Sequence, residues 1–247
     1  MAELVFLSIV IPARNEENRL PETLKQTFNF LESQPYQAEV IIVENGSSDR
    51  TSEVTQDYQK CHPNLLLLHE DRPGKGGAVK RGMLAASGTY RFMSDADLSM
   101  PVTEIPRFLP PRLNDFDLAI GSREAAGSIR YAEPLYRHLG GRAINLMIRL
   151  LALPGLQDTQ CGYKAFHGPA AEKLFSVQTM TGWSFDIEIL FVARRLGMRI
   201  VELPIPWYFK AETKVNPFQD ALRMWADILI IRSNARRGFY PGRINVR

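Results

Sequence analysis

The chain has 247 residues, of which 45% are hydrophobic and 23% are charged, so it is globular rather than disordered and large enough for one α/β domain or two small ones. Its formal net charge of +3 is too small to indicate nucleic-acid binding, and we expect no such partner. Cys61 and Cys161 lack CxxC spacing, which argues against a zinc knuckle and a disulfide framework and favours a reducing, cytoplasmic setting. No run reaches the roughly 18 apolar residues of a spanning helix, and the first apolar run has no basic leader, so we expect neither a membrane span nor a signal peptide.

The first half of the chain alternates apolar runs with amphipathic stretches. We expect strands at residues 4–12, 38–45, 64–70, 89–97 and 116–123, with helices between them at 21–31, after the turn at 46–49 and after the glycine loop at 73–77. This alternation predicts right-handed βαβ units and a mainly parallel central sheet flanked by helices. Ligands of such sheets bind beyond the carboxyl ends of the strands, and the polar clusters at 14–16, 44–47 and 94–97 fall at those ends.

The second half of the chain has a different pattern. We expect helices at 131–153, 183–197 and 216–238 and strands at 161–166 and 198–209. The last helix is expected to carry one apolar side, formed by Phe218, Ala221, Leu222, Trp225, Ile228 and Leu229. No linker interrupts the chain, which predicts one domain over residues 1–215 and a basic, amphipathic C-terminal helix and tail over 216–247.

The sharpest motif is Asp95-Ala96-Asp97, at the end of the expected strand 89–97. Two carboxylates at a strand terminus can reach one hard cation, because the chain turns there. Mg²⁺ or Mn²⁺ held by one or two carboxylates and by substrate phosphates is the arrangement expected of such a pair. The cation would neutralise the charge that builds on a departing diphosphate. A solvated turn with a helix-capping aspartate is the alternative for an isolated motif of this kind.

Three further segments have both a structural and a functional interpretation. Asn15 and Glu16 can cap a helix, or they can contact a base and ribose together with nearby backbone. Glu44 or Asn45 can accept a hydrogen bond from uracil N3–H, although the sequence VENGSSD is also typical of a turn before a helix. The glycine loop around Lys75 lacks the spacing of a Walker loop, but a lysine on flexible glycines can still close over a nucleotide-sugar.

Taken together, the motifs resemble a known family. SIVIPARNEE, VENGSSD, GKGGAVKRG, SDADLSMP, GSR, DTQCGYKAF and WSFDIEIL occur in the order and spacing of the family 2 inverting glycosyltransferases, which have the nucleotide-binding GT-A fold. More narrowly they are similar to the polyprenyl-phosphate sugar transferases, such as dolichyl-phosphate glucosyltransferase and dolichyl-phosphate mannose synthase. The resemblance covers residues 7 to 215, and DTQCGYKAF and WSFDIE are closer to the glucosyl branch.

The resemblance implies roles for individual residues. The nucleotide-sugar would be bound by Pro12, Arg14, Asn15, Glu16, Glu44, Asn45, Lys75, Asp95 and Ala96. Asp95 and Asp97 would hold Mg²⁺ or Mn²⁺ and the diphosphate. Arg123, Arg137 and Lys214 would bind the acceptor phosphate, and Asp97, Asp158 and Arg123 would form the catalytic centre. Glu44 and Asn45 stand where the family usually has two aspartates, which leaves both uracil and guanine open as the base.

The chemistry of an acceptor phosphate explains which side chains are needed. Its second pKa is near 6, so at neutral pH it is already largely a dianion and needs no strong general base. It needs cationic capture, which arginine provides with two parallel hydrogen bonds. A hydroxyl acceptor would instead require a base, and Asp158 is the candidate. Arg137 and Arg149 could alternatively lie on an exposed helix face, and Asp158 could cap a loop.

The expected function is therefore inverting transfer of glucose from UDP-glucose to a polyprenyl phosphate. The stretches 131–153 and 216–238 join apolar and arginine-bearing faces, which is typical of helices that lie in a membrane interface, although packing on the core or on a partner subunit fits equally. This favours a cytoplasmic enzyme that can be peripheral at a membrane. The alternatives are a soluble glycosyltransferase with a hydroxyl acceptor and a nucleotide-sugar-binding protein without turnover; a nucleotidyltransferase is more remote, because no glycine-rich loop follows the first strand.

Overall fold

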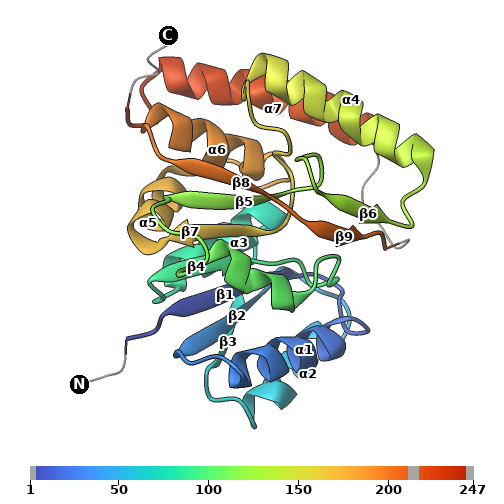
Figure 1. Ribbon diagram of the computed structural model, residues 1–247, viewed down its shortest axis with the longest axis vertical. Helices are drawn as coiled ribbons and strands as arrows, with labels where there is room; N and C mark the ends of the chain where they lie inside the picture. The colour runs from blue at the N-terminus through green and yellow to red at the C-terminus, as the bar shows by residue number, and fades with distance from the viewer. Residues whose placement is uncertain (1–3, 211–216, 243–247) are drawn as a thin grey trace.

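The computed structural model describes residues 4–210 and 217–242, except for the side chains of 135–137, 139, 143 and 217–221. A seven-stranded sheet runs through the molecule in the order β3-β2-β1-β4-β7-β5-β8 (Figure 1). Its strands are β1 (Leu7–Ala13), β2 (Ala38–Glu44), β3 (Leu65–His69), β4 (Tyr90–Met93), β5 (Leu118–Ser122), β7 (Lys164–His167) and β8 (Ile200–Pro204). Only β7 is antiparallel to its neighbours β4 and β5, so the expected mainly parallel sheet is confirmed.

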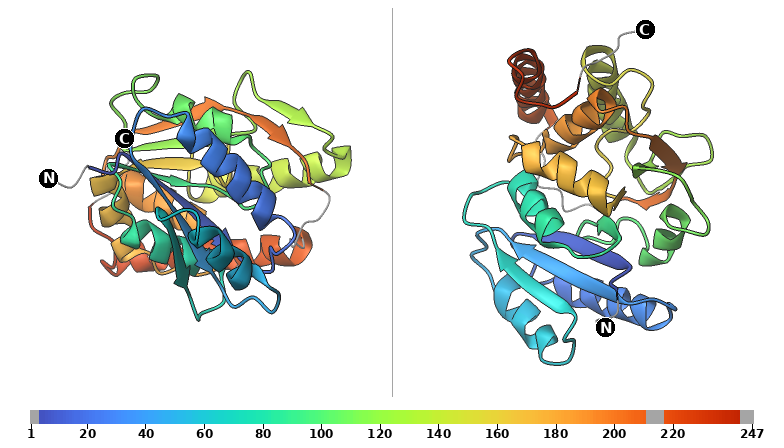
Figure 2. Two further views of the ribbon diagram at one scale, coloured as in Figure 1. Left: turned by 90° about the horizontal axis from the view of Figure 1, so that it is seen from below. Right: turned by 90° about the vertical axis from the view of Figure 1, so that its left-hand side faces the viewer.

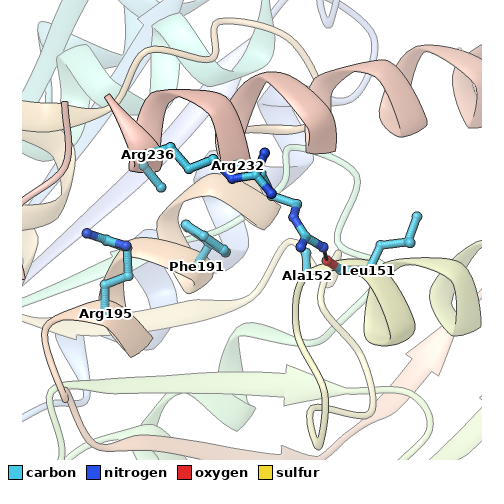
Figure 3. Close-up of a pocket in the computed structure, with 7 residues that line it drawn as sticks. Leu151, Ala152, Phe191, Arg195, Arg232 and Arg236 are labelled. Carbon is cyan, nitrogen blue, oxygen red and sulfur yellow. Dashed lines mark hydrogen bonds between the residues drawn. The ribbon is translucent and has the colours of Figure 1, made fainter. Parts of the chain in front are cut away.

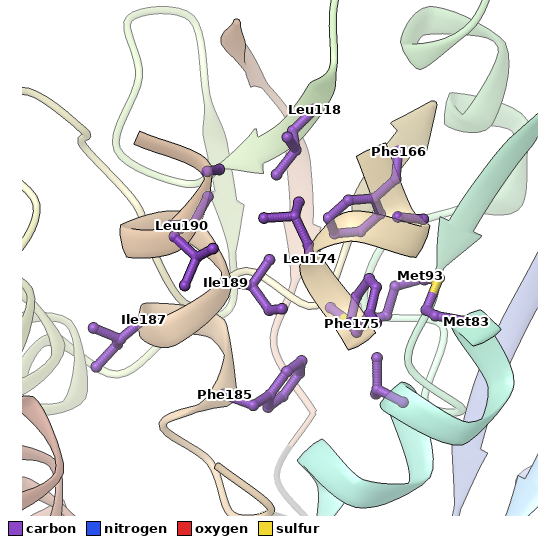
Figure 4. Close-up of a cluster of buried hydrophobic side chains, with 14 of the residues drawn as sticks. Met83, Met93, Leu118, Phe166, Leu174, Phe175, Phe185, Ile187, Ile189 and Leu190 are labelled. Atoms are coloured by element: carbon purple, nitrogen blue, oxygen red, sulfur yellow. The ribbon is translucent and has the colours of Figure 1, made fainter. Parts of the chain in front are cut away.

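Helices cover both faces of this sheet (Figure 2). They are α1 (Leu20–Glu32), α2 (Thr51–Gln59), α3 (Lys75–Ala85), α4 (Leu135–Leu151), α5 (Gly168–Val177), α6 (Phe185–Arg195) and α7 (Pro217–Arg236), with a 3₁₀ helix, η1 (Val102–Phe108). Alternate side chains of a strand point to opposite faces. Ile41 of β2 therefore packs with Met83 of α3 and Phe175 of α5 in one core (Figure 4), whereas Ile42 packs with Leu24 of α1 and Phe108 of η1 in the other.

Burial on both faces explains why the parallel strands were predictable from sequence. Such strands appear as short apolar runs, and β1 and β2 are almost completely buried. The carboxyl ends of β1, β2 and β4 meet at one edge, because Ala13 pairs with Glu44 and Val10 with Met93. The clusters at 14–16, 44–47 and 94–97 therefore follow neighbouring strands, as expected.

The second half of the chain differs from the prediction in several elements. The strand expected at 198–209 is two strands, because β8 pairs with β5 while β9 (Pro206–Tyr208) pairs with β6 (Ile129–Tyr131) in a separate sheet. Ile205 joins them: its N–H donates to Ser122, and its carbonyl accepts from Ile129. The sequence did not predict β6, η1 or α5, which are short or begin at glycine and proline.

Helices α4 and α7 lie side by side at one end of the molecule, beyond α6 (Figure 1). The single apolar side expected for 216–238 is wrong in one respect. Ile228 is buried in the core, whereas Leu222, Trp225 and Leu229 are about half exposed; Phe218 and Ala221 fall outside the described side chains. The boundary after residue 215 stays a prediction, and α7 packs into the core of residues 4–210 through Ile228 and Ile231. Within the described residues, no helix has the length and apolar character needed to cross a membrane.

Candidate active site

Two loops at the carboxyl edge of the sheet are held together by hydrogen bonds. The backbone N–H of Asn15 donates to Ser47 Oγ at 3.0 Å, and the Asn15 side-chain oxygen accepts from Ser48 N at 2.8 Å. Glu17 N donates to Asp49 Oδ2 at 3.0 Å. Asn15 has a φ of 53°, a left-handed conformation that asparagine tolerates better than most residues. The loop after β1 is thus fixed against the loop after β2, next to the expected nucleotide site.

Glu44, the last residue of β2, is a buried carboxylate that lies among hydrogen-bond donors. Its Oε1 accepts from the Ser47 backbone N–H, and its Oε2 lies 3.1 Å from His69 Nδ1. Burial favours the protonated acid, but the hydrogen bonds from Ser47 and the nearby His69 outweigh burial and lower the pKa of Glu44. Glu44 is therefore an ionised hydrogen-bond acceptor at neutral pH.

Asn45 binds the glycine loop with both ends of its amide. Its Nδ2 donates to the carbonyls of Glu70 and Arg72 at 2.8 and 2.7 Å, and its Oδ1 accepts from Gly74 N at 2.8 Å. The side chain is buried. In this arrangement Asn45 fixes the loop that leads to Lys75.

Lys75 begins α3, and its ammonium group lies at the centre of a group of acids. Its Nζ is 2.5 Å from Asp95 Oδ1 and 5.3 Å from the centre of the Trp183 ring. Burial would lower the pKa of Lys75, but Asp95, Asp186 and Asp97 outweigh it and raise that pKa. Lys75 is therefore a retained cation beside the Asp95-Ala96-Asp97 motif.

Asp95 packs directly against the backbone of Gly162. A Cβ atom at position 162 would lie 1.9 Å from Asp95 Oδ2, closer than any contact that real side chains make. Only glycine therefore allows the Asp95 carboxylate to occupy its observed place. Gly162 lies in the motif DTQCGYKAF, but the sequence alone predicted no role for it.

Asp97 lies on the wall of a cavity of about 510 Å³ between the start of α1 and residues 96–101. Its Oδ1 accepts from Ser99 N at 2.8 Å. Ala96 also lines the cavity, and its carbonyl accepts from Thr23 Oγ1 at 2.7 Å, which joins the motif to α1. The turn that follows β4 thus presents Asp97 to an open space.

The two acids of the motif fit the hard cation expected from the sequence. Asp95 contacts Lys75 directly, and Asp97 is near enough to act electrostatically on the same ammonium group. In the part of the chain that the structure describes, no group of three or more His, Cys, Asp or Glu side chains could hold a metal ion. The protein would therefore supply two carboxylates, and substrate phosphates and water would have to supply the other ligands, which is the usual environment of Mg²⁺.

Arg123 and Asp158 form a two-pronged ion pair beyond the end of β5. Arg123 Nε and Nη2 donate to the two carboxylate oxygens at 2.6 and 2.9 Å, and the Arg123 backbone N–H donates at 2.9 Å. Burial would raise the pKa of Asp158, but Arg123 outweighs it and lowers that pKa to about 2. Arg123 also lies over the ring of Trp207, 5.6 Å from its centre. The structure thus brings two of the expected catalytic residues together as an ionised pair.

A second buried ion pair was not predicted from the sequence. Lys164 Nζ donates to Asp186 Oδ1 at 2.6 Å, and both side chains are almost fully buried. Burial dominates over Lys164 and Lys75 and raises the pKa of Asp186. The pair joins β7 to the start of α6, across 22 positions of sequence, and Asp186 is near enough to act on Lys75. Both residues lie in motifs of the sequence, DTQCGYKAF and WSFDIEIL, but no local periodicity indicates that they pair.

Two expected acceptor-binding residues cannot be placed. Lys214 and the side chain of Arg137 fall outside the described residues. Pro12 is half-buried in β1 beside Val43, and Arg14 and Glu16 belong to the loop that follows it. Their roles toward the nucleotide, like those of the other site residues, stay predictions.

Comparison with known proteins agrees with this architecture. Residues 8–175 match the model of glycosyl transferase family 2. Dolichyl-phosphate beta-glucosyltransferase of Dictyostelium discoideum is 32% identical over 243 residues, which cover 92% of this chain and 74% of that protein. The Homo sapiens protein of the same description is 33% identical over 242 residues, with the same shares covered.

A solved structure shows the same fold at low identity. Glucosyl-3-phosphoglycerate synthase from Mycobacterium tuberculosis, in complex with Mn²⁺, UDP-glucose and phosphoglyceric acid, superposes with a TM-score of 0.68. The match covers 93% of this chain and 80% of that chain at 18% identity. The fold expected from the motifs is thereby confirmed. From the family match, which spans both the parallel half of the sheet and β7, and from relatives of more than 30% identity, the chain belongs to glycosyl transferase family 2.

Proposed function

We propose that this glycosyltransferase moves glucose from UDP-glucose to the phosphate of a dolichyl or other polyprenyl phosphate, with inversion and with the help of Mg²⁺ or Mn²⁺. The observation that carries the proposal is the gathering of Lys75, Asp95 and Asp97 at the carboxyl edge of the sheet. The acceptor and the sugar are supported by the descriptions of the relatives, and the donor by the UDP-glucose complex of the structural neighbour.

In the proposed reaction an acceptor phosphate oxygen attacks the anomeric carbon while the bond from that carbon to the diphosphate oxygen breaks. Asp95 and Asp97 would hold the metal ion, which when bound neutralises the leaving diphosphate. Lys75 adds a fixed positive charge beside the same diphosphate. Because the site is partly buried, this charge stabilises the leaving group more strongly than it would in water. Glu44, an ionised acceptor at the end of β2, is suited to an N–H of the base.

The state of Asp158 disfavours the alternative with a hydroxyl acceptor. A general base works best when its pKa lies near the operating pH, and the pKa of Asp158 is about 2. Both of its oxygens also accept hydrogen bonds from Arg123. A phosphate acceptor is already anionic and needs no such base. We therefore assign Asp158 to the positioning of Arg123, whose Nη1 has no hydrogen-bond partner among the described residues and can bind the acceptor phosphate.

We also propose that α4 and α7 rest on a membrane. Leu146 and Leu150 of α4 and Leu222, Trp225 and Leu229 of α7 are exposed large apolar side chains. Both helices also contain arginines, Arg142 and Arg149 in α4 and Arg223 and Arg232 in α7. This combination of apolar and basic residues is typical of helices that lie in a membrane interface. Contacts also link α7 to the site: Asp227 accepts from Ser184 Oγ at 2.6 Å, and Met224 Sδ lies 3.3 Å from Gln160 Nε2. Such a placement would bring a lipid-linked acceptor to the enzyme at the cytoplasmic face.

The test is a transfer assay with UDP-glucose and Mn²⁺ that compares a polyprenyl phosphate with the corresponding polyprenol. We expect glucose to enter the lipid phase only with the phosphate. Asp97→Ala should abolish turnover, and Glu53→Ala on exposed α2 serves as the matched control. Equal transfer to the polyprenol, or full activity of Asp97→Ala, would overturn the proposal.

A further inference from the structure

A second cavity, of about 280 Å³, lies among the ends of three helices (Figure 3). We call it the arginine cavity and define it by Leu151, Ala152, Phe191, Arg195, Arg232 and Arg236. Leu151, Arg195 and Arg236 are the last residues of α4, α6 and α7. Asp186 stands nine residues before Arg195 on α6, so the two ends of that helix are about 14 Å apart. The arginine cavity is therefore separate from the site that holds Asp186 and Lys75.

Among the described residues, the hydrogen-bond partners of Arg232 and Arg195 in this cavity are neutral carbonyl groups. Arg232 Nη1 donates to the carbonyl of Leu151 at 2.7 Å, and Arg195 Nη2 donates to that of Gly242 at 2.5 Å. Over residues 4–210 and 217–242, none of the three cavity arginines lies within ion-pair distance of a carboxylate. Arg195 Nε is also buried, and no group in the described part of the chain accepts a hydrogen bond from it.

Helix ends account for part of this positive charge, but not for all of it. Each helix C-terminus carries roughly half a negative charge, which attracts arginine. Three such ends supply about −1.5 against three guanidinium charges. Arg232 and Arg236 are exposed, so water solvates much of this remaining charge. The buried Nε of Arg195 has no hydrogen-bond partner among the described residues, and an anion in the cavity would supply one.

The size and walls of the arginine cavity narrow the class of anion. At about 30 Å³ per water molecule it has room for roughly nine waters, which is enough for a phosphate group and a short ester but not for a nucleotide-sugar. Phe191 and Ala152 give it an apolar wall. Three guanidinium groups match an oxyanion with several acceptor oxygens, because each can donate two parallel hydrogen bonds.

We propose that the arginine cavity binds the phosphate of a phosphate ester, at a site additional to the catalytic one. The same chemistry occurs in a soluble glycerol phosphate and in the headgroup of an anionic phospholipid. The helices α4 and α7, whose ends line the arginine cavity, also carry the exposed apolar side chains Leu150 and Ile230.

The test uses the full chain without donor or acceptor, so that its outcome is independent of the transfer reaction. Calorimetry would measure binding of sn-glycerol 3-phosphate, and flotation would measure binding to phosphatidylcholine vesicles with and without phosphatidic acid. Arg236→Gln is compared with Arg237→Gln, which removes the same charge from the next residue, outside the cavity. Arg232→Gln is a second cavity variant, and thermal melting checks that each variant folds.

We expect Arg236→Gln and Arg232→Gln to weaken binding about tenfold or more, the usual effect of losing a hydrogen bond to a charged group, while Arg237→Gln binds like the parent. Loss of glycerol phosphate binding would identify a soluble ligand. Loss confined to phosphatidic acid vesicles would identify a lipid headgroup. Equal weakening in Arg236→Gln and Arg237→Gln, undiminished binding in the cavity variants, or no binding in either assay would overturn the proposal.

Discussion

The Lys75 ammonium lies 2.5 Å from the Asp95 carboxylate, so the start of α3 and the turn after β4 meet in an ion pair. The same ammonium group also lies over the Trp183 ring, 5.3 Å from its centre. The pair brings a permanent cation to the place where a diphosphate is expected, and it orients one of the two acids of the metal motif.

Replacing Lys75 by Met should remove this charge while keeping most of the side-chain volume. Since its hydrogen bonds involve charged groups, we expect kcat/KM for the donor to fall about tenfold to a hundredfold at saturating Mn²⁺. Steady-state kinetics with varied UDP-glucose would measure the effect. Lys25→Met, on the exposed side of α1, is the matched control. Unchanged donor kinetics in Lys75→Met would remove the role assigned to Lys75.

Gly162→Ala should displace the Asp95 carboxylate, because the new Cβ would lie 1.9 Å from Asp95 Oδ2. We expect a loss of at least about tenfold in the apparent affinity for Mn²⁺, which a titration of activity against the metal would show. Gly141→Ala in α4 is the control, since a Cβ there meets no atom within 4 Å. If both variants have the parental metal dependence, the close contact of Gly162 with Asp95 is not needed for metal binding.

Asp158 should make the stability of the protein depend on pH in the acid range. Its pKa falls from 3.8 to about 2 on folding, so its contribution is complete above pH 3.8 and disappears as the pH falls through about 2. The shift corresponds to about 2 kcal/mol in the free energy of unfolding. Denaturation of the parent and of Asp158→Asn should therefore give curves that differ at pH 6 and converge near pH 2. A difference that stays constant with pH would show that Asp158 is not an ionised partner of Arg123.

Asn45→Ala should loosen the loop at residues 70–74, because three hydrogen bonds to that loop disappear together. We expect the free energy of unfolding to fall by about 1–3 kcal/mol and KM for the donor to rise. Asn64→Ala is the comparison, since its exposed side chain donates a single hydrogen bond, to Ala38. Chemical denaturation and donor kinetics of the two variants measure both effects. Equal losses in Asn45→Ala and Asn64→Ala would contradict the role of Asn45 as a clamp.

The sequence predicted the parallel half of the fold well because its signals are local. β1 and β2 are continuous apolar runs, and the polar residues that follow them fall at one edge of the sheet once the strands are parallel. The metal motif at Asp95 and Asp97 was found for the same reason, since it follows directly after a buried strand.

The remainder depends on contacts between distant segments. The buried Lys164 ammonium group is held by distant Asp186 as well as by the nearby Cys161 carbonyl, and Gly162 is required because Asp95 packs against it. No spacing within either segment encodes these contacts. On α7 the sequence assigned Ile228 to the same side as Leu222, but the burial of Ile228 is set by the position of α7 on α6 and α4.

The reversed direction of β7 determines which part of the chain can enter the catalytic edge. A parallel strand brings there the residues that follow it, whereas β7 begins where β4 ends, with Lys164 opposite Met93. The residues that lie at the catalytic edge are therefore those that precede β7, from Asp158 to Gly162. If β7 ran parallel to β4, the same residues would emerge at the opposite end of the sheet, far from Asp95 and Arg123.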